Sequence, residues 1–152
     1  MAILTHGTWV LLADAEKALL LHNKVDAISP ALDVVRKTEQ ENPSDYEQSA
    51  NRPGRRKDPG TGQSSAMEDT DWHELAKERF AHDLADILYK HAHRGDFDRI
   101  VLVATPYVLG RLRDELHKEV RERVVAEITK DLTHHPLDKV EKMLKAELDP
   151  KL

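Results

Sequence analysis

The run from Arg99 to Ala104 (RIVLVA) constrains the fold most, because it is apolar almost without interruption. Such a run is typical of a central parallel strand that is covered on both faces of its sheet. Thr105-Pro106 follows as a helix cap and first helical residue and predicts a helix through about His117. A buried strand that leads directly into a helix favours an α/β domain.

Three further strands are predicted near the start of the chain. Thr8–Ala13 and Lys17–His22 are apolar runs of strand length, and Asp14-Ala15-Glu16 between them is short enough for a hairpin. Neither run alternates cleanly, which again indicates a sheet covered on both faces. A third run, Leu32–Glu39, follows a breaker pair, and we expect the three strands to be antiparallel.

Amphipathic stretches complete the pattern. A long helix is predicted from about Asp71 to Arg94, with Asp71 in the cap position and Gly95 as its C-terminal stop. Arg123–Ile128 reads as a fifth strand, and Pro136–Glu147 as a last helix. The order predicts a mixed five-stranded sheet with about three helices, close to the ribonuclease H-like topology.

The 152 residues are expected to form one domain, interrupted by a long polar loop at about 43–70. This stretch holds three of the six glycines and three of the seven prolines, so it breaks both helical and strand periodicity. Loops of this length inside a compact domain are usually functional or disordered. We therefore expect the function to depend on this loop.

Positive charge is concentrated in the loop. Residues 51–60 contain four basic side chains against Asp58, a local charge of +3 on a chain whose net charge is −5. The basic residues are Arg52, Arg55, Arg56 and Lys57. A basic stretch on an acidic protein favours contact with a polyanion, while the simpler alternative is a solvated loop.

The sequence lacks the residues that several classes of functional site require. There is no cysteine, which excludes disulfides and thiolate metal sites. The His73-Glu74 pair begins like a zinc motif, but Lys77 stands where the second histidine is required. Asp14 could serve a metal nuclease, but Val103-Ala104-Thr105 supplies no matching carboxylate, so Asp14 is better read as a hairpin-turn residue. We predict no metal and no cofactor.

The N-terminus has no basic residue before its apolar run, and no stretch is long enough to span a bilayer. These features predict a cytoplasmic protein without a membrane partner, and no DNA contact is expected. The predicted 71–94 helix has an exposed face of mixed charge, which leaves the oligomeric state open.

Within the loop, Gly60-Thr61-Gly62-Gln63 directly follows the basic residues. Glycines free the backbone, so the amide of Gln63 could reach into the site of another molecule, and neighbouring arginines could hold phosphates. The alternative is a flexible connector made of small residues.

The chain also resembles the host-attachment protein family, whose members are similar to the middle domain of archaeal and eukaryotic release factors and are grouped as family twelve. The matching segments are His6–Asp14, Asp71–Glu74, Lys77–Ala81, Leu102–Ala104, Leu109-Gly110, Lys130–Thr133 and His135-Pro136.

The resemblance carries an implication for the loop. In release factors, a Gly-Gly-Gln loop directly before a long helix enters the ribosomal peptidyl-transferase centre. Gly62 and Gln63 occupy the equivalent position here, with Thr61 in place of the first glycine. The resemblance therefore implies contact with the ribosome or tRNA through Arg52, Arg55, Arg56, Lys57 and Gly60. It also implies peptidyl-tRNA hydrolysis by Gly62 and Gln63 if the protein is an enzyme.

Two alternatives stay open. The family name implies a non-enzymatic interaction protein that supports bacterial attachment to host cells. The α/β architecture alone is compatible with a domain that binds a nucleotide or another small molecule.

Overall fold

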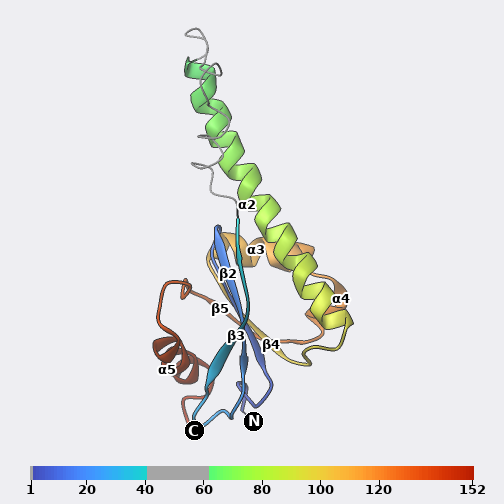
Figure 1. Cartoon of the computed structure of the whole chain (residues 1–152), viewed down its shortest axis with the longest axis vertical. Helices are drawn as coiled ribbons and strands as arrows, with labels where there is room; N and C mark the ends of the chain where they lie inside the picture. Colours follow the sequence, from blue (N-terminus) through green and yellow to red (C-terminus); the bar gives the residue numbers. More distant parts are fainter. Residues whose placement is uncertain (1, 41–61) are drawn as a thin grey trace.

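A computed structural model describes residues 2–40 and 62–152, with the backbone alone for 62–71 (Figure 1). Its centre is a five-stranded sheet in the order β3-β2-β1-β4-β5. The strands are β1 (Trp9–Ala13), β2 (Lys17–Asn23), β3 (Leu32–Glu39), β4 (Ile100–Ala104) and β5 (Val124–Thr129). The first three strands pair antiparallel, whereas β4 is parallel to both β1 and β5. The predicted mixed sheet, with a central parallel strand, is confirmed.

Four helices lie in the described part of the chain. They are α2 (Gly62–His93), α3 (Pro106–Glu115), α4 (Lys118–Arg121) and α5 (Leu137–Leu148). The predicted helix through about His117 ends at Glu115, and a short helix that was not predicted, α4, follows it. Nδ1 of His117 accepts a hydrogen bond from the Glu119 N–H at 3.0 Å and caps α4.

The start of α2 differs from the prediction. The helix begins at Gly62, so the stretch 62–70 is helical instead of part of a loop, and the predicted cap Asp71 lies inside the helix. Residues 62–70 carry no apolar stripe, which is why their pattern indicates a loop. An existing helix needs no new nucleus to grow, because each added residue also adds a hydrogen bond. The remainder of the predicted loop, 43–61, lies outside the described residues.

Two apolar cores enclose the sheet, one on each face (Figure 1). Trp9, Leu11 and Ala13 of β1 pack under α2, α3 and α4. Val10 and Leu12 point to the other face, where α5 packs. Burial of both faces explains why the strand sequences do not alternate between apolar and polar residues.

No helix in residues 2–40 and 62–152 is long and apolar enough to cross a membrane.

Candidate functional site

The predicted catalytic pair lies at the far end of the longest helix. Gly62 and Gln63 form the beginning of α2, and Figure 1 shows this end extending beyond the sheet. Ala76 is the first buried residue among the α2 side chains that the structure describes, which begin at Trp72. A helix rises about 1.5 Å per residue, so Gln63 lies about 20 Å along the helix axis from that first buried contact.

The predicted phosphate contacts cannot be placed beside this pair. Arg52, Arg55, Arg56, Lys57 and Gly60 all lie outside the described residues. The chain places them shortly before Gly62 in sequence, and their interaction with Gln63 stays a prediction.

The described residues add a polar cluster at the carboxyl end of β1, where Asp14 begins the turn to β2. Oδ1 of Asp14 accepts hydrogen bonds from the backbone N–H groups of Glu16 and Lys17, both at 2.7 Å. These contacts confirm that Asp14 is a hairpin-turn residue.

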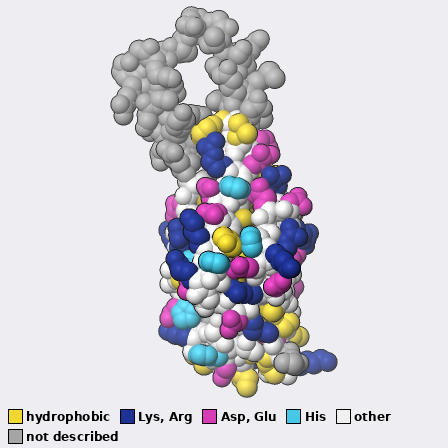
Figure 2. All heavy atoms as spheres, turned by 90° about the vertical axis from the view of Figure 1, so that its right-hand side faces the viewer, with side chains coloured by type: hydrophobic (Ala, Val, Ile, Leu, Met, Phe, Trp, Pro, Cys, Tyr) yellow, Lys and Arg dark blue, Asp and Glu magenta, His cyan; other side chains and the backbone are white. Residues whose placement is uncertain are grey.

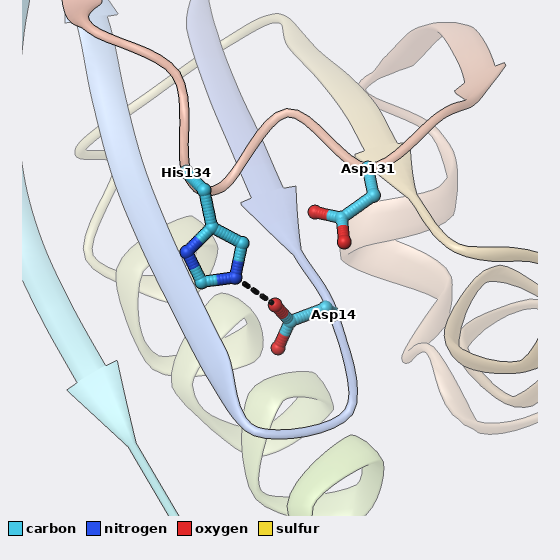
Figure 3. Close-up of side chains that lie close together, drawn as sticks. All are labelled: Asp14, Asp131 and His134. Atoms are coloured by element: carbon cyan, nitrogen blue, oxygen red, sulfur yellow. Dashed lines mark ion pairs between the residues drawn. The ribbon is translucent and has the colours of Figure 1, made fainter.

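The segment between β5 and α5 supplies the other members of this cluster (Figure 3). The Thr133 hydroxyl lies 2.8 Å from Oδ2 of Asp14 and 2.7 Å from Oδ1 of Asp131. Nε2 of His134 lies 3.4 Å from Oδ2 of Asp14. Thr133 is only 2% exposed, although Asp131 and His134 on either side of it are exposed. A buried hydroxyl thus joins the β1–β2 turn to a segment more than one hundred residues later.

Asp14, Asp131 and His134 have the chemistry of metal ligands, since their nearest ligand atoms lie within 4.8 Å of one another. Both carboxylate oxygens of Asp14, however, already accept hydrogen bonds from the chain. Contacts with the chain thus hold Asp14 without a cation, and exposed acidic side chains commonly lie together in the absence of one.

Gln40 lies next to the same turn. Its backbone N–H donates to the Glu16 carbonyl at 2.9 Å, and its side-chain amide donates to the Ala15 carbonyl at 2.6 Å. Gln40 is the last described residue before the basic stretch, and these two bonds tie it to the β1–β2 turn.

Sequence reasoning did not select Gln40 or Thr133. Neither residue belongs to a motif of its own, and Asp131 to Thr133 was matched only as part of the family resemblance. Their importance depends on contacts between residues that are far apart in sequence, which the local pattern does not encode.

Comparison with known proteins identifies this chain as a release-factor-like domain. The model of the bacterial archaeo-eukaryotic release factor family 12 matches residues 7–144. The chain therefore belongs to this family. The family description refers to release factors, and the comparisons do not support the host-attachment name. No curated protein matches the chain.

Among solved structures, the chain is similar to the crystal structure of an archaeal translation termination factor, aRF1. The TM-score is 0.47 and the identity 10%, over 92% of this chain and 34% of that one. A second similar structure, an archaeal protein, gives a TM-score of 0.43 and 8% identity, over 92% of this chain and 36% of that one. The chain spans about a third of the length of each, and both likenesses are distant.

Proposed function

We propose that this chain is a translation-associated domain that contacts the ribosome or tRNA through the basic stretch (residues 51–60) and the tip of α2 (Gly62–Ser65). Family membership supports a role related to translation. The observation that carries the proposal is the position of Gln63 at the start of a 32-residue helix, directly after the basic residues in sequence. A long helix can present its end to a site that the bulk of the domain cannot enter.

Electrostatics favours contact at this end. The basic stretch has a charge of +3, although the whole chain has −5. The face in Figure 2 mixes basic and acidic side chains without a patch of one sign. On α2, charged side chains also pair with one another, as Lys77 with Glu74 and Lys90 with Asp86. A polyanion would therefore approach residues 51–60 in preference to this face.

If the domain is also catalytic, the reaction we propose is hydrolysis of the ester in peptidyl-tRNA. The Gln63 amide would orient water against the ester carbonyl, and Gly62 would allow the backbone to approach closely. The first N–H groups of a helix have no acceptor within the helix, and the helix dipole makes this end positive. Both properties would stabilise a developing oxyanion at the tip of α2.

Co-sedimentation with bacterial ribosomes tests the contact. We expect the wild-type protein to migrate with ribosomes at low salt and to dissociate at moderate salt, since phosphate contacts weaken as salt rises. Arg55→Ala/Arg56→Ala should lose this binding. Lys139→Ala/Lys142→Ala, which removes the same charge from exposed positions of α5, should keep it. Protein that stays at the top of the gradient at low salt would refute the proposal.

Catalysis requires a separate assay. With purified peptidyl-tRNA bound to ribosomes, Gln63→Ala should abolish peptide release and leave co-sedimentation unchanged, whereas Ser64→Ala should retain most activity. Binding without release by the wild-type protein would restrict the function to binding.

The alternative function, a non-enzymatic role in attachment to host cells, has no described residue that favours it. Finding the protein on the outer surface of intact cells would support that alternative instead.

A further inference from the structure

Two histidines from different elements meet at the start of α4. His117 directly precedes α4, and its Nδ1 accepts a hydrogen bond from the Glu119 N–H at 3.0 Å. His93 belongs to the last turn of α2, and its Nδ1 lies 3.4 Å from both carboxylate oxygens of Glu119. One histidine thus contacts the backbone of Glu119, and the other contacts its side chain.

The ring of Tyr89 on α2 lies against both histidines. Its centre is 4.2 Å from that of the His117 ring and 5.5 Å from that of the His93 ring. Both histidines are exposed, so both can exchange protons with solvent. The charged side chains next to them in sequence are engaged elsewhere: Lys90 with Asp86, Arg94 with Asp96, Lys118 with Glu122, and Arg121 with the carbonyls of Leu116 and Arg113.

Protonation acts on the two contacts in opposite directions. A neutral imidazole can accept a hydrogen bond at one nitrogen, but a protonated imidazole carries a hydrogen on both nitrogens and accepts none. Protonated His117 must therefore release the Glu119 N–H. Protonated His93, in contrast, gains an ion pair with the Glu119 carboxylate. Histidine ordinarily changes its charge between about pH 5 and 8, where a glutamate carboxylate is ionised.

Other contacts hold α4 against α2 throughout this pH range. Val120 of α4 is fully buried in the core beneath α2. The guanidinium of Arg123, directly before β5, donates a hydrogen bond to the Ala92 carbonyl in α2. Neither contact involves a group that titrates between pH 5 and 8. The hold on Glu119 can therefore change while α4 stays in place.

We propose that this junction is a pH-sensitive switch, in which acidification transfers Glu119 from the His117 cap to an ion pair with His93. At neutral pH, the cap closes the start of α4. At mildly acidic pH the cap is open, and the Glu119 side chain ties the same segment to α2. The switch is independent of RNA binding, because all of its contacts lie at the end of α2 that is opposite to Gln63.

Hydrogen exchange of the Glu119 N–H, measured by NMR and corrected for the intrinsic effect of pH, tests the release. Protection of this N–H in the wild type should fall about two- to tenfold from about pH 8 to about pH 5, the effect of losing one hydrogen bond. The fall should follow the titration of the His117 ring, observed through its carbon-bound protons. His117→Asn supplies a cap oxygen that accepts at every pH, so its protection should stay constant. His117→Ala should give low protection at both pH values.

His93→Ala tests the transfer. The N–H groups of Val120 and Arg121 both donate to the His117 carbonyl. In the wild type they should stay protected at about pH 5, because the new ion pair holds the start of α4. In His93→Ala their protection at this pH should be about two- to threefold lower, the effect of losing one exposed ion pair.

His82→Ala is the matched control, because it removes another exposed histidine of α2, one that lies 3.7 Å from the Glu115 carboxylate. It should change none of these quantities. Constant protection of the Glu119 N–H in the wild type, or the same fall in His117→Asn, would overturn the proposal. Equal protection of Val120 and Arg121 at acidic pH with and without His93 would overturn it too. The wild-type titration needs no variant, so it decides the release even if a substitution unfolds the chain.

Discussion

Asn23 at the end of β2 is completely buried, and its side chain joins three parts of the chain. Its Nδ2 donates to the carbonyls of Leu4 and Asp26, both at 2.9 Å, and lies 3.3 Å from that of Thr5. Its Oδ1 accepts from the N–H groups of Val25 and Ala31, at 3.2 and 3.1 Å. Replacement by alanine leaves these backbone groups without their partner.

The loss in the free energy of unfolding can be estimated from these contacts. Each hydrogen bond contributes about 1 kcal/mol net, and a buried group left unpaired costs about 1–3 kcal/mol. Four bonds of ordinary length are lost, but several of the backbone groups are only partly buried and can regain water. We therefore expect Asn23→Ala to lower the free energy of unfolding by about 3–4 kcal/mol. For a domain of this size, that corresponds to a drop of about 10 °C in the melting temperature.

Urea denaturation followed by circular dichroism measures this loss. Asn23→Asp is the matched variant, because it keeps the shape and replaces the donor with an oxygen that faces carbonyl oxygens. It should destabilise the protein more than Asn23→Ala at neutral pH, and the gap should narrow as protonation restores a donor at lower pH. A loss below 1 kcal/mol for Asn23→Ala, or an aspartate variant more stable than the alanine variant at pH 7, would refute this reasoning.

Three further predictions concern the cores and the end of α2. The hydrogen bond from His91, and next that from Arg94, hold the pKa of Asp96 below its ordinary value of 3.8. The ionised Asp96 carboxylate therefore stabilises the protein above about pH 3.8, and this stabilisation is lost as the pH falls through the lower pKa of the folded state. The urea midpoints of wild type and Asp96→Asn should converge as the pH falls through this range. Gly95 has φ +79° and open space around a Cβ, so Gly95→Ala should cost only backbone strain, about 1 kcal/mol by urea denaturation, and an unchanged midpoint would contradict this. Leu102→Ala in the fully buried β4 should cost about 3 kcal/mol, and a loss below 1 kcal/mol would show that the core collapses around it.

β1, β2 and β4 could be predicted because each is largely an apolar run bounded by polar or breaker residues, whereas β3 is mostly exposed and follows a breaker pair. β4 (Ile100–Ala104) is the clearest example, since burial on both faces leaves no polar position within it. Thr105-Pro106 marked the start of α3 correctly for the same local reason, because proline at the first helical position lacks only an N–H that would be unpaired.

The features that the sequence did not predict depend on contacts between distant residues or on the structure that surrounds a segment. Gly62 could not be recognised as the start of α2, because residues 62–70 carry no apolar stripe. The short helix α4 begins at a hydrogen bond that His117 accepts, which the apolar pattern does not encode. The contact between Asp14 and Thr133 joins residues 119 positions apart, and no local pattern predicts such a pair. The glycines and basic residues beside Gln63 allowed a role in reaching another molecule, but only the family resemblance pointed to the ribosome.

Site-specific cross-linking tests the central claim most directly. A photoreactive amino acid would replace Gln63 at the tip of α2 or, as a control, Lys142 on the exposed side of α5. After irradiation with bacterial ribosomes carrying tRNA at low salt, we expect the probe at position 63 to give products with ribosomal RNA or tRNA. The probe at position 142 should give few or none. Equal products from both positions, or none from position 63, would contradict the proposal that this domain binds the translation machinery through the end of its long helix.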